Sequence, residues 1–521
     1  MRADVVRLYR AVHSWAGILT GLILFVAFYA GAITMFKEPI ERWATPPIPM
    51  TAVSLEQGSA LIAGVLAVRP DAAQGFTLAL TGRTEEERIL RLTWQKTRND
   101  PAPWSATLAS EGGVVVERLR PAALGRLVDV VHRTAGIPGD LDLGTAVTGV
   151  ASAVYAVALV SGVIILLPSL VKDLFAFRVG SSRKRMWLDA HNIVGIFSLP
   201  FHMVIALTAV IFGLHDFIYG AQDHVVYRGE LKTIMAASTP SRQIRPDPQP
   251  AAMLPPETIL AQVRSIAPGF MPVSLQYHNA GTQSALVRVW GKDPRYLVRN
   301  MGFLLLSPVT GAVIDTEYLP GHQGEWSASV SSFFALHFGT FGGETIRWGY
   351  FFLGLAGAFL FYSGNRVWVE SRCRVSRQAD WPPAPTSRPA ILMAAATTGV
   401  CLGCVSGLSL TMAAGKWLYG TAADLDAWHW GLYYGVFLAA CGWAFHRGVA
   451  RAGVELLWLA SATTAAIPAT TALAWVVPGL GLWVSGGVAG LAVDLVALAG
   501  ALIFAWMARM ARARQGTMCS N

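Results

Sequence analysis

Long apolar runs alternate with polar stretches along the chain. A helix needs about 20 predominantly apolar residues to cross the hydrocarbon core of a bilayer. Eight runs reach that length and predict eight transmembrane helices. They lie at 14–36, 146–168, 189–213, 346–368, 390–413, 428–447, 453–477 and 484–507. The pattern therefore predicts a multi-pass membrane protein that is mainly α-helical.

The first apolar run follows several arginines and so superficially resembles a secretory signal peptide. It is too long for the apolar core of such a peptide, and its end, Phe36-Lys37-Glu38-Pro39, is a poor cleavage site. We expect this run to remain in the protein as its first span.

Basic residues flank the predicted spans on one side. They are Arg2, Arg7, Arg10, Lys172, Arg178, Arg183, Lys184, Arg185, Arg366, Arg372, Arg374, Arg377, Arg447, Arg451, Arg509, Arg512 and Arg514. Because cytoplasmic loops are enriched in Lys and Arg, this side is assigned to the cytoplasm, with both termini and the tail 508–521 on it. The formal charge of +9 follows from these flanks. They do not form the basic face of a soluble domain, so no nucleic-acid partner is expected.

Two long polar segments, 37–145 and 214–345, interrupt the spans and fall on the outer side of the membrane. Each contains a helix-like stretch followed by alternating, strand-like stretches. The helices are predicted at 54–70 and 256–269, and the strands at 76–80, 88–94, 273–277 and 284–290, followed by a Pro/Gly hairpin at 302–315. The same small α+β module is thus predicted twice.

The spans repeat as well. His13 and His191 open the first and third spans with the same His-x-x-x-Gly spacing, and an aliphatic-His element, at His132 and at His337, follows each polar segment. The next span ends in Ser-Gly in both cases. Residues 5–168 and 185–368 are therefore predicted to be a parallel internal duplication, related by a pseudo-two-fold axis along the membrane normal. Residues 390–507 add four spans without a comparable repeat.

Four histidines at equivalent places of a duplicated unit predict a site on its axis. His13 is expected to meet His191 at the cytoplasmic side, and His132 to meet His337 at the outer side. A flat macrocycle with two axial positions fits between two imidazoles, as in haem proteins. Proton relays, interfacial anchors and copper or zinc ligands are the alternative roles for these histidines.

His202 adds a second possibility for the outer site. It follows His191 by eleven residues, about 16.5 Å along a helix and within about 20° of the same face. It is therefore a candidate to replace His132 as the partner of His337, or to line the path between two haems, although symmetry favours His132. Three arginines near the two sites are candidates to pair with haem propionates: Arg10, Arg133 and Arg347.

These residues resemble the PepSY-associated transmembrane helix family. The resemblance covers about residues 5–370 and is carried by the His-x-x-x-Gly openings, by "DAHNIVGIFSLPFHMVIALTAV" (189–210), by "LHFGTFGG" (336–343) and by two modules that look like PepSY domains. Two features depart from the family pattern. Ala209 stands where the family usually has glycine, and the four C-terminal spans are additional.

The resemblance implies a di-haem siderophore-iron reductase, in which electrons cross the membrane through two b-type haems and reduce a ferric siderophore or another ferric chelate at the periplasmic face. By position in the motifs, His13, His191, His202 and His337 match family histidines, and His132 matches less closely. These five residues are thus the expected haem-iron ligands.

No flavin or nicotinamide domain is apparent. The chain has no strand–GxGxxG–helix unit, and the cytoplasmic loops 169–188 and 369–389 are too short to fold one. The electron donor is therefore expected to be a separate reductase or a membrane quinol.

Two other functions are compatible with the sequence. One is a non-catalytic envelope protein whose PepSY-like modules bind peptides or regulate a protease, but this gives no reason for the symmetric histidines. The other is an iron-chelate transporter, which would need interrupted, polar-lined helices. Haem content separates both from the reductase.

Overall fold

The computed structural model describes residues 3–47, 53–81, 89–97, 102–109, 113–169, 183–237, 244–297, 299, 301–372 and 387–516. The chain divides into two compact units. The helical unit contains Met1–Pro47, Ala122–His215 and Trp348–Asn521, and the sheet unit contains Ile48–Pro121 and Asp216–Arg347. The regions around 37–47 and 122–145, expected in the first polar module, thus group with the helices.

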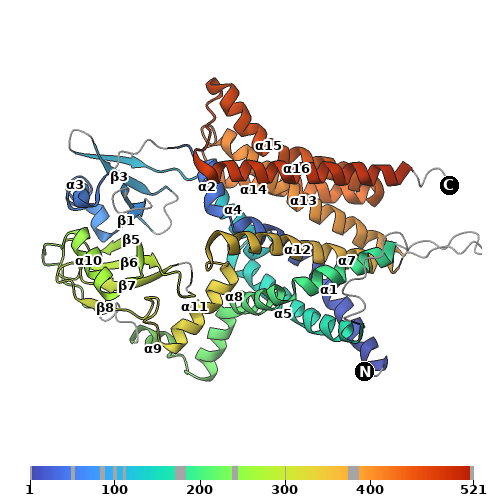
Figure 1. The fold of residues 1–521 in the computed structure, drawn as a ribbon, viewed down its shortest axis with the longest axis horizontal. Coiled ribbons are helices and arrows are strands. Elements are labelled where there is room, and N and C mark those ends of the chain that lie inside the picture. Colours follow the sequence, from blue (N-terminus) through green and yellow to red (C-terminus); the bar gives the residue numbers. More distant parts are fainter. Residues whose placement is uncertain are drawn as a thin grey trace, which may run out of the picture. The chain divides into compact units, whose positions relative to one another are not determined.

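The helical unit is built from long helices (Figure 1). They are α1 (Ala3–Thr34), α5 (Leu141–Leu166), α7 (Arg183–Phe197), α8 (Leu199–Val225), α12 (Gly343–Glu370), α13 (Arg388–Leu418), α14 (Leu425–Arg447), α15 (Val449–Val476) and α16 (Gly487–Gly516). Two short helices, α2 (Lys37–Ala44) and α4 (Leu124–Thr134), complete it. The last residues of α8 and the first of α12 are counted with the sheet unit.

Six helices of the described chain are long and apolar enough to cross a membrane. They are α1, α5, α8, α13, α15 and α16. The chain is therefore a multi-pass membrane protein. The two other expected spans, 346–368 and 428–447, coincide with the long but more polar helices α12 and α14. An eight-span topology stays a prediction.

The expected third span is divided into α7 and α8 at Ser198. Pro200 follows two residues later and has no backbone N–H to donate to the preceding turn. At the break, the backbone N–H and Oγ of Ser198 both donate to the carbonyl of Val194, at 3.0 and 2.5 Å. The break falls between His191 and His202, so these two side chains do not lie on one continuous helix.

Close helix packing in this unit depends on small residues. Gly149 of α5 lies against Gly213 of α8, and a Cβ added at Gly149 would be 2.7 Å from the carbonyl carbon of Gly213. Without a hydrophobic driving force inside a bilayer, such backbone contacts are a main source of helix association.

The sheet unit holds one eight-stranded antiparallel sheet in the order β4-β3-β2-β1-β5-β6-β7-β8 (Figure 1). Its strands are β1 (Gly75–Thr81), β2 (Ile89–Trp94), β3 (Trp104–Leu108), β4 (Val114–Arg118), β5 (Met271–His278), β6 (Leu286–Lys292), β7 (Gly302–Leu306) and β8 (Val313–Asp315). The helices α3 (Gly58–Val68), α9 (Leu231–Ala237), α10 (Pro256–Ile266) and α11 (Glu325–Phe338) belong to the same unit.

The two predicted modules are halves of this single sheet. Each half is a helix followed by four strands, and β1 pairs with β5 at the centre, where Phe76 stacks on Tyr277 with ring centroids 4.8 Å apart. The residues that end α3 and α10 also adopt nearly the same backbone conformation. Arg69 has φ −133° and ψ 77°, and Ala267 has φ −138° and ψ 82°. The predicted helices and strands are confirmed, and β3 and β4 are additional.

Candidate functional site

The rings of His13 and His191 lie close together in the helical unit. His13 comes from α1 and His191 from α7, and their centroids are 6.2 Å apart with ring planes at 75°. The sequence predicted that these two histidines would meet, and the structure brings them together.

Each of these rings is fixed by a helix carbonyl. Nδ1 of His13 donates to the carbonyl oxygen of Ala158 on α5 at 2.8 Å. Nδ1 of His191 lies 3.1 Å from the carbonyl oxygen of Leu360 on α12 and 3.1 Å from Oγ of Ser363. Because a carbonyl oxygen only accepts, Nδ1 carries the proton in both rings. The lone pair is therefore on Nε2, the nitrogen that a metal ion can bind.

A glycine follows each accepting carbonyl by four residues and lies beside the ring. A Cβ added at Gly162 would be 3.0 Å from Cε1 of His13, and one added at Gly364 would be 3.3 Å from Cε1 of His191. The two Ser-Gly pairs recognised as a repeat, Ser161-Gly162 and Ser363-Gly364, thus have a physical purpose. Their glycines let an imidazole approach the backbone of the neighbouring helix.

His132 is held in the same way. It lies on α4, and its Nδ1 donates to the carbonyl oxygen of Ala27 on α1 at 2.8 Å. Gly31 follows Ala27 by four residues, and a Cβ added there would be 2.8 Å from Nδ1 of His132. Three predicted histidines therefore share one arrangement, with the proton on Nδ1 and a glycine beside the ring.

His202 has a different environment. It is fully buried on α8, with Nδ1 2.6 Å from the hydroxyl oxygen of Tyr155 and its ring 5.6 Å from that of Phe28. A hydroxyl can donate or accept, so this contact does not fix the tautomer. Nε2 of His202 is buried and has no hydrogen-bond partner among the described residues. Such an orphaned group destabilises a fold by about 1–3 kcal/mol, and a ligand relieves that penalty.

His337 lies in the sheet unit, near the end of α11. Its ring centroid is 5.6 Å from that of Phe338, and α11 is ended by Gly339 in the left-handed conformation, at φ 59°. The "HFG" of the sequence motif is therefore a helix terminus. The pairing of His337 with His132 or His202 stays a prediction.

The predicted propionate partners stay predictions too. Arg133 is exposed on α4 next to His132, and Arg10 is exposed on α1. Arg347, at the start of α12, forms an ion pair with Glu344 at 3.0 Å.

Sequence reasoning missed the environment of His429. On α14 this side chain is fully buried, and neither ring nitrogen has a partner among the described residues. Gly415 of α13 leaves room for the ring, because a Cβ added at Gly415 would be only 3.4 Å from Nε2 of His429. Only the packing of α13 against α14 reveals this.

A buried polar network lies farther along α13. Lys416 is 2% exposed, and its Nζ is 4.0 Å from the ring centroid of Trp43. Nε1 of Trp43 donates to Oδ1 of Asp494 at 3.0 Å, and Oγ1 of Thr471 donates to the same oxygen at 3.0 Å. These contacts provide hydrogen bonds to the carboxylate of Asp494 on α16 and connect α2 to the C-terminal helices.

The distance between the His13 and His191 rings meets one requirement of a metal ion held by two imidazoles. Imidazoles on opposite sides of one metal ion, with bonds of about 2.0 Å, have ring centroids roughly 6.4 Å apart, and these two are 6.2 Å apart. Two donors are too few for a zinc site, which takes four ligands. They suit an iron whose remaining ligands come from a macrocycle. Among the described residues, no group of three or more His, Cys, Asp or Glu side chains is placed to hold a metal ion.

These features define a multi-pass helical membrane protein in which two helices bring His13 and His191 together, with a separate antiparallel α+β unit. Residues 10–371 match the family described as the PepSY-associated TM region. The chain therefore belongs to the PepSY-associated transmembrane family. A search among curated proteins found no match.

Proposed function

We propose that this protein is a di-haem b-type oxidoreductase of the bacterial inner membrane. It passes electrons across the bilayer and reduces a ferric siderophore, or another ferric chelate, at the periplasmic side. The observation that carries the proposal is the pair His13 and His191, with rings 6.2 Å apart and each Nδ1 bound to a helix carbonyl.

The chain prepares these two imidazoles as ligands. The carbonyls of Ala158 and Leu360 hold the rings in one tautomer and orientation, and they make Nε2 a stronger donor. The glycines beside the rings keep this geometry free of strain. When bound, haem supplies one-electron chemistry at iron, while the protein supplies position and an apolar surrounding.

The second haem is assigned to the outer histidines. His132 repeats the carbonyl-and-glycine arrangement of His13 and His191, which supports its role as a ligand. Symmetry makes His337 its partner, and the orphaned Nε2 of His202 supports the alternative. Arg133 and Arg347 are assigned to the propionates.

The donor and acceptor complete the proposal. A separate reductase or a membrane quinol delivers electrons, and the ferric chelate receives them at the periplasmic side. The substrate enters as a ferric complex and leaves with Fe2+, one electron being transferred for each iron.

A reduced-minus-oxidised visible spectrum of the purified full-length protein tests this function. The expected result is b-type α and Soret bands with two haems per chain by pyridine haemochrome assay. Ferric chelates are expected to reoxidise the reduced protein in stopped-flow mixing. A colourless protein from haem-replete cells overturns the proposal and favours a haem-free PepSY protein.

A further inference from the structure

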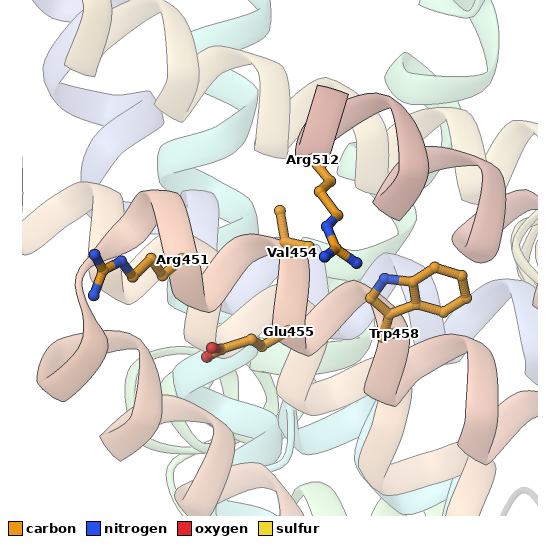
Figure 2. A pocket seen from close by; sticks show the side chains of 5 residues that line it. All are labelled: Arg451, Val454, Glu455, Trp458 and Arg512. Atoms are coloured by element: carbon orange, nitrogen blue, oxygen red, sulfur yellow. The ribbon is translucent and has the colours of Figure 1, made fainter. Parts of the chain in front are cut away.

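A cavity lies where α15 begins and α16 ends. Its volume is about 250 Å³, and it is lined by Arg451, Val454, Glu455 and Trp458 of α15 and by Arg512 of α16. In Figure 2, the Arg512 side chain extends from α16 toward Val454 and Trp458. The lining thus combines two guanidinium groups with an indole ring.

The cavity carries an excess of positive charge. The carboxylate of Glu455 accepts a hydrogen bond from Nη2 of Arg447 at 3.1 Å and another from Nε1 of Trp443 at 2.6 Å. Its charge is therefore balanced by α14. Neither Arg451 nor Arg512 forms an ion pair with a described residue.

Both arginines lie at the ends of candidate membrane spans. Arg451 is in the first turn of α15, and Arg512 is in the last turns of α16. The ends of membrane-spanning helices lie at the level of the lipid headgroups, and tryptophan side chains such as Trp458 favour the same layer. The amino end of α15 adds the partial positive charge of a helix terminus.

We infer that this cavity binds the phosphodiester headgroup of an anionic phospholipid. The guanidinium of Arg512 contacts the phosphate oxygens, since it presents paired donors that match them. Arg451, whose side chain extends away from Arg512 in Figure 2, turns toward the bound phosphate from the other end of the cavity. Trp458 contacts the glycerol and the first part of the acyl chain. The cavity volume is smaller than the roughly 300 Å³ at which pockets for drug-sized ligands begin. A cavity of this size suits a lipid headgroup. Basic pockets between spanning helices bind anionic lipids by this chemistry.

The inference is independent of the proposed haems and concerns α14, α15 and α16 only. A bound lipid would join α15 to α16 through a negative charge between two positive ones. The C-terminal spans would then be stabilised selectively in membranes that contain anionic lipid.

Native mass spectrometry of the full-length protein tests the lipid site. The protein is titrated with phosphatidylglycerol, with phosphatidylcholine and with inorganic phosphate, in wild type, Arg451→Gln, Arg512→Gln and Arg509→Gln. Arg509 is a matched control because it lies one turn from Arg512 on α16, is exposed and does not line the cavity. Thermal unfolding of each variant without added lipid verifies that the fold is intact.

The expected result is tighter binding of phosphatidylglycerol than of phosphatidylcholine. Loss of either cavity arginine is expected to weaken phosphatidylglycerol binding about tenfold, the effect of losing one charged hydrogen bond. Arg509→Gln should stay within twofold of wild type. Equal affinity for both lipids, or unchanged affinity in both cavity variants, overturns the inference. Binding of inorganic phosphate without any preference for the anionic lipid also overturns the lipid assignment.

Discussion

The imidazole of His13 lies 6.2 Å from the imidazole of His191, although the two residues come from different helices. Each ring is held by the backbone of a third helix, α5 for His13 and α12 for His191. The pair is therefore positioned by four helices at once. A change in any of them is expected to alter what the two rings can bind.

Replacing the individual histidines tests the assignment of the two haems. His13→Ala or His191→Ala should remove one haem per chain, and His132→Ala or His337→Ala should remove the other. The double variant of His13 and His132 should be colourless. His215→Ala is the control, because that ring is exposed on α8. If His202→Ala loses a haem while His337→Ala keeps both, the outer pairing by symmetry is wrong.

Gly162→Ala tests the approach of His13 to α5. The added methyl group would lie 3.0 Å from Cε1 of the ring, so the imidazole must shift. Haem affinity at this site should fall by about tenfold, as for other residues that orient a metal ligand. Gly17→Ala on α1 is the matched control, since nothing lies within 4 Å of its Cβ position. Haem titration of the apoprotein measures both variants, and equal affinities would contradict the role of Gly162.

Ser363→Ala tests the hydrogen bonding of His191. Oγ of Ser363 lies 3.1 Å from Nδ1, so its loss weakens electron donation by the ring and disfavours the ferric state. The midpoint potential of this haem should rise by roughly 20 mV, which corresponds to a fraction of one hydrogen bond. Ser161→Ala provides the comparison, because Ser161 donates to the carbonyls of Val157 and Ala158 and not to His13. Redox titration would refute the idea if the two variants shifted equally.

The pH dependence of the sheet unit tests a buried carboxylate. Asp293 is 2% exposed and accepts hydrogen bonds from Nε and Nη2 of Arg295 at 2.9 and 2.6 Å, and these bonds lower its pKa. A lowered pKa stabilises the fold above the unfolded value of about 3.9, and this contribution is lost as pH falls through the folded value.

Asp293→Asn should therefore lower the Tm of this unit by about 2–4 °C at pH 7, the effect of roughly 1 kcal/mol on a domain of this size. The difference from wild type should begin to shrink as the pH falls below about 4 and vanish once the pH is below the lowered pKa of the folded Asp293 carboxyl. Hydrogen exchange of the backbone amides in β6 and β7, measured during thermal unfolding, reports the stability of the region around Asp293. A difference that persists unchanged at low pH would show that the hydrogen bonds, and not the charge, are responsible.

Much of the fold could be predicted from the length of the apolar runs and from the alternation of apolar and polar residues in the strands. The pairing of His13 with His191 followed from the repeated His-x-x-x-Gly spacing. Their carbonyl partners could not be predicted, because Ala158 and Leu360 contribute backbone atoms that any residue carries. The strands β3 and β4 were missed since "WSATL" and "VVVER" lack clear alternation.

Contacts between distant segments account for the other differences. The contact of Tyr155 with His202 needs α5 to pack against α8, and the burial of His429 needs α14 to pack against α13. The two modules form one sheet because β1 pairs with β5, although several helices separate these strands along the chain. Sequence periodicity is local and does not register such pairings.

The central pairing of β1 with β5 also constrains how the protein is made. When the first four strands have left the ribosome, β1 is still an open edge whose backbone donors and acceptors have no partner. Its partner is synthesised only after α5, α7 and α8. Biogenesis must therefore shield a half-built sheet while further helices enter the bilayer, and a truncated chain ending before β5 should aggregate through that exposed edge.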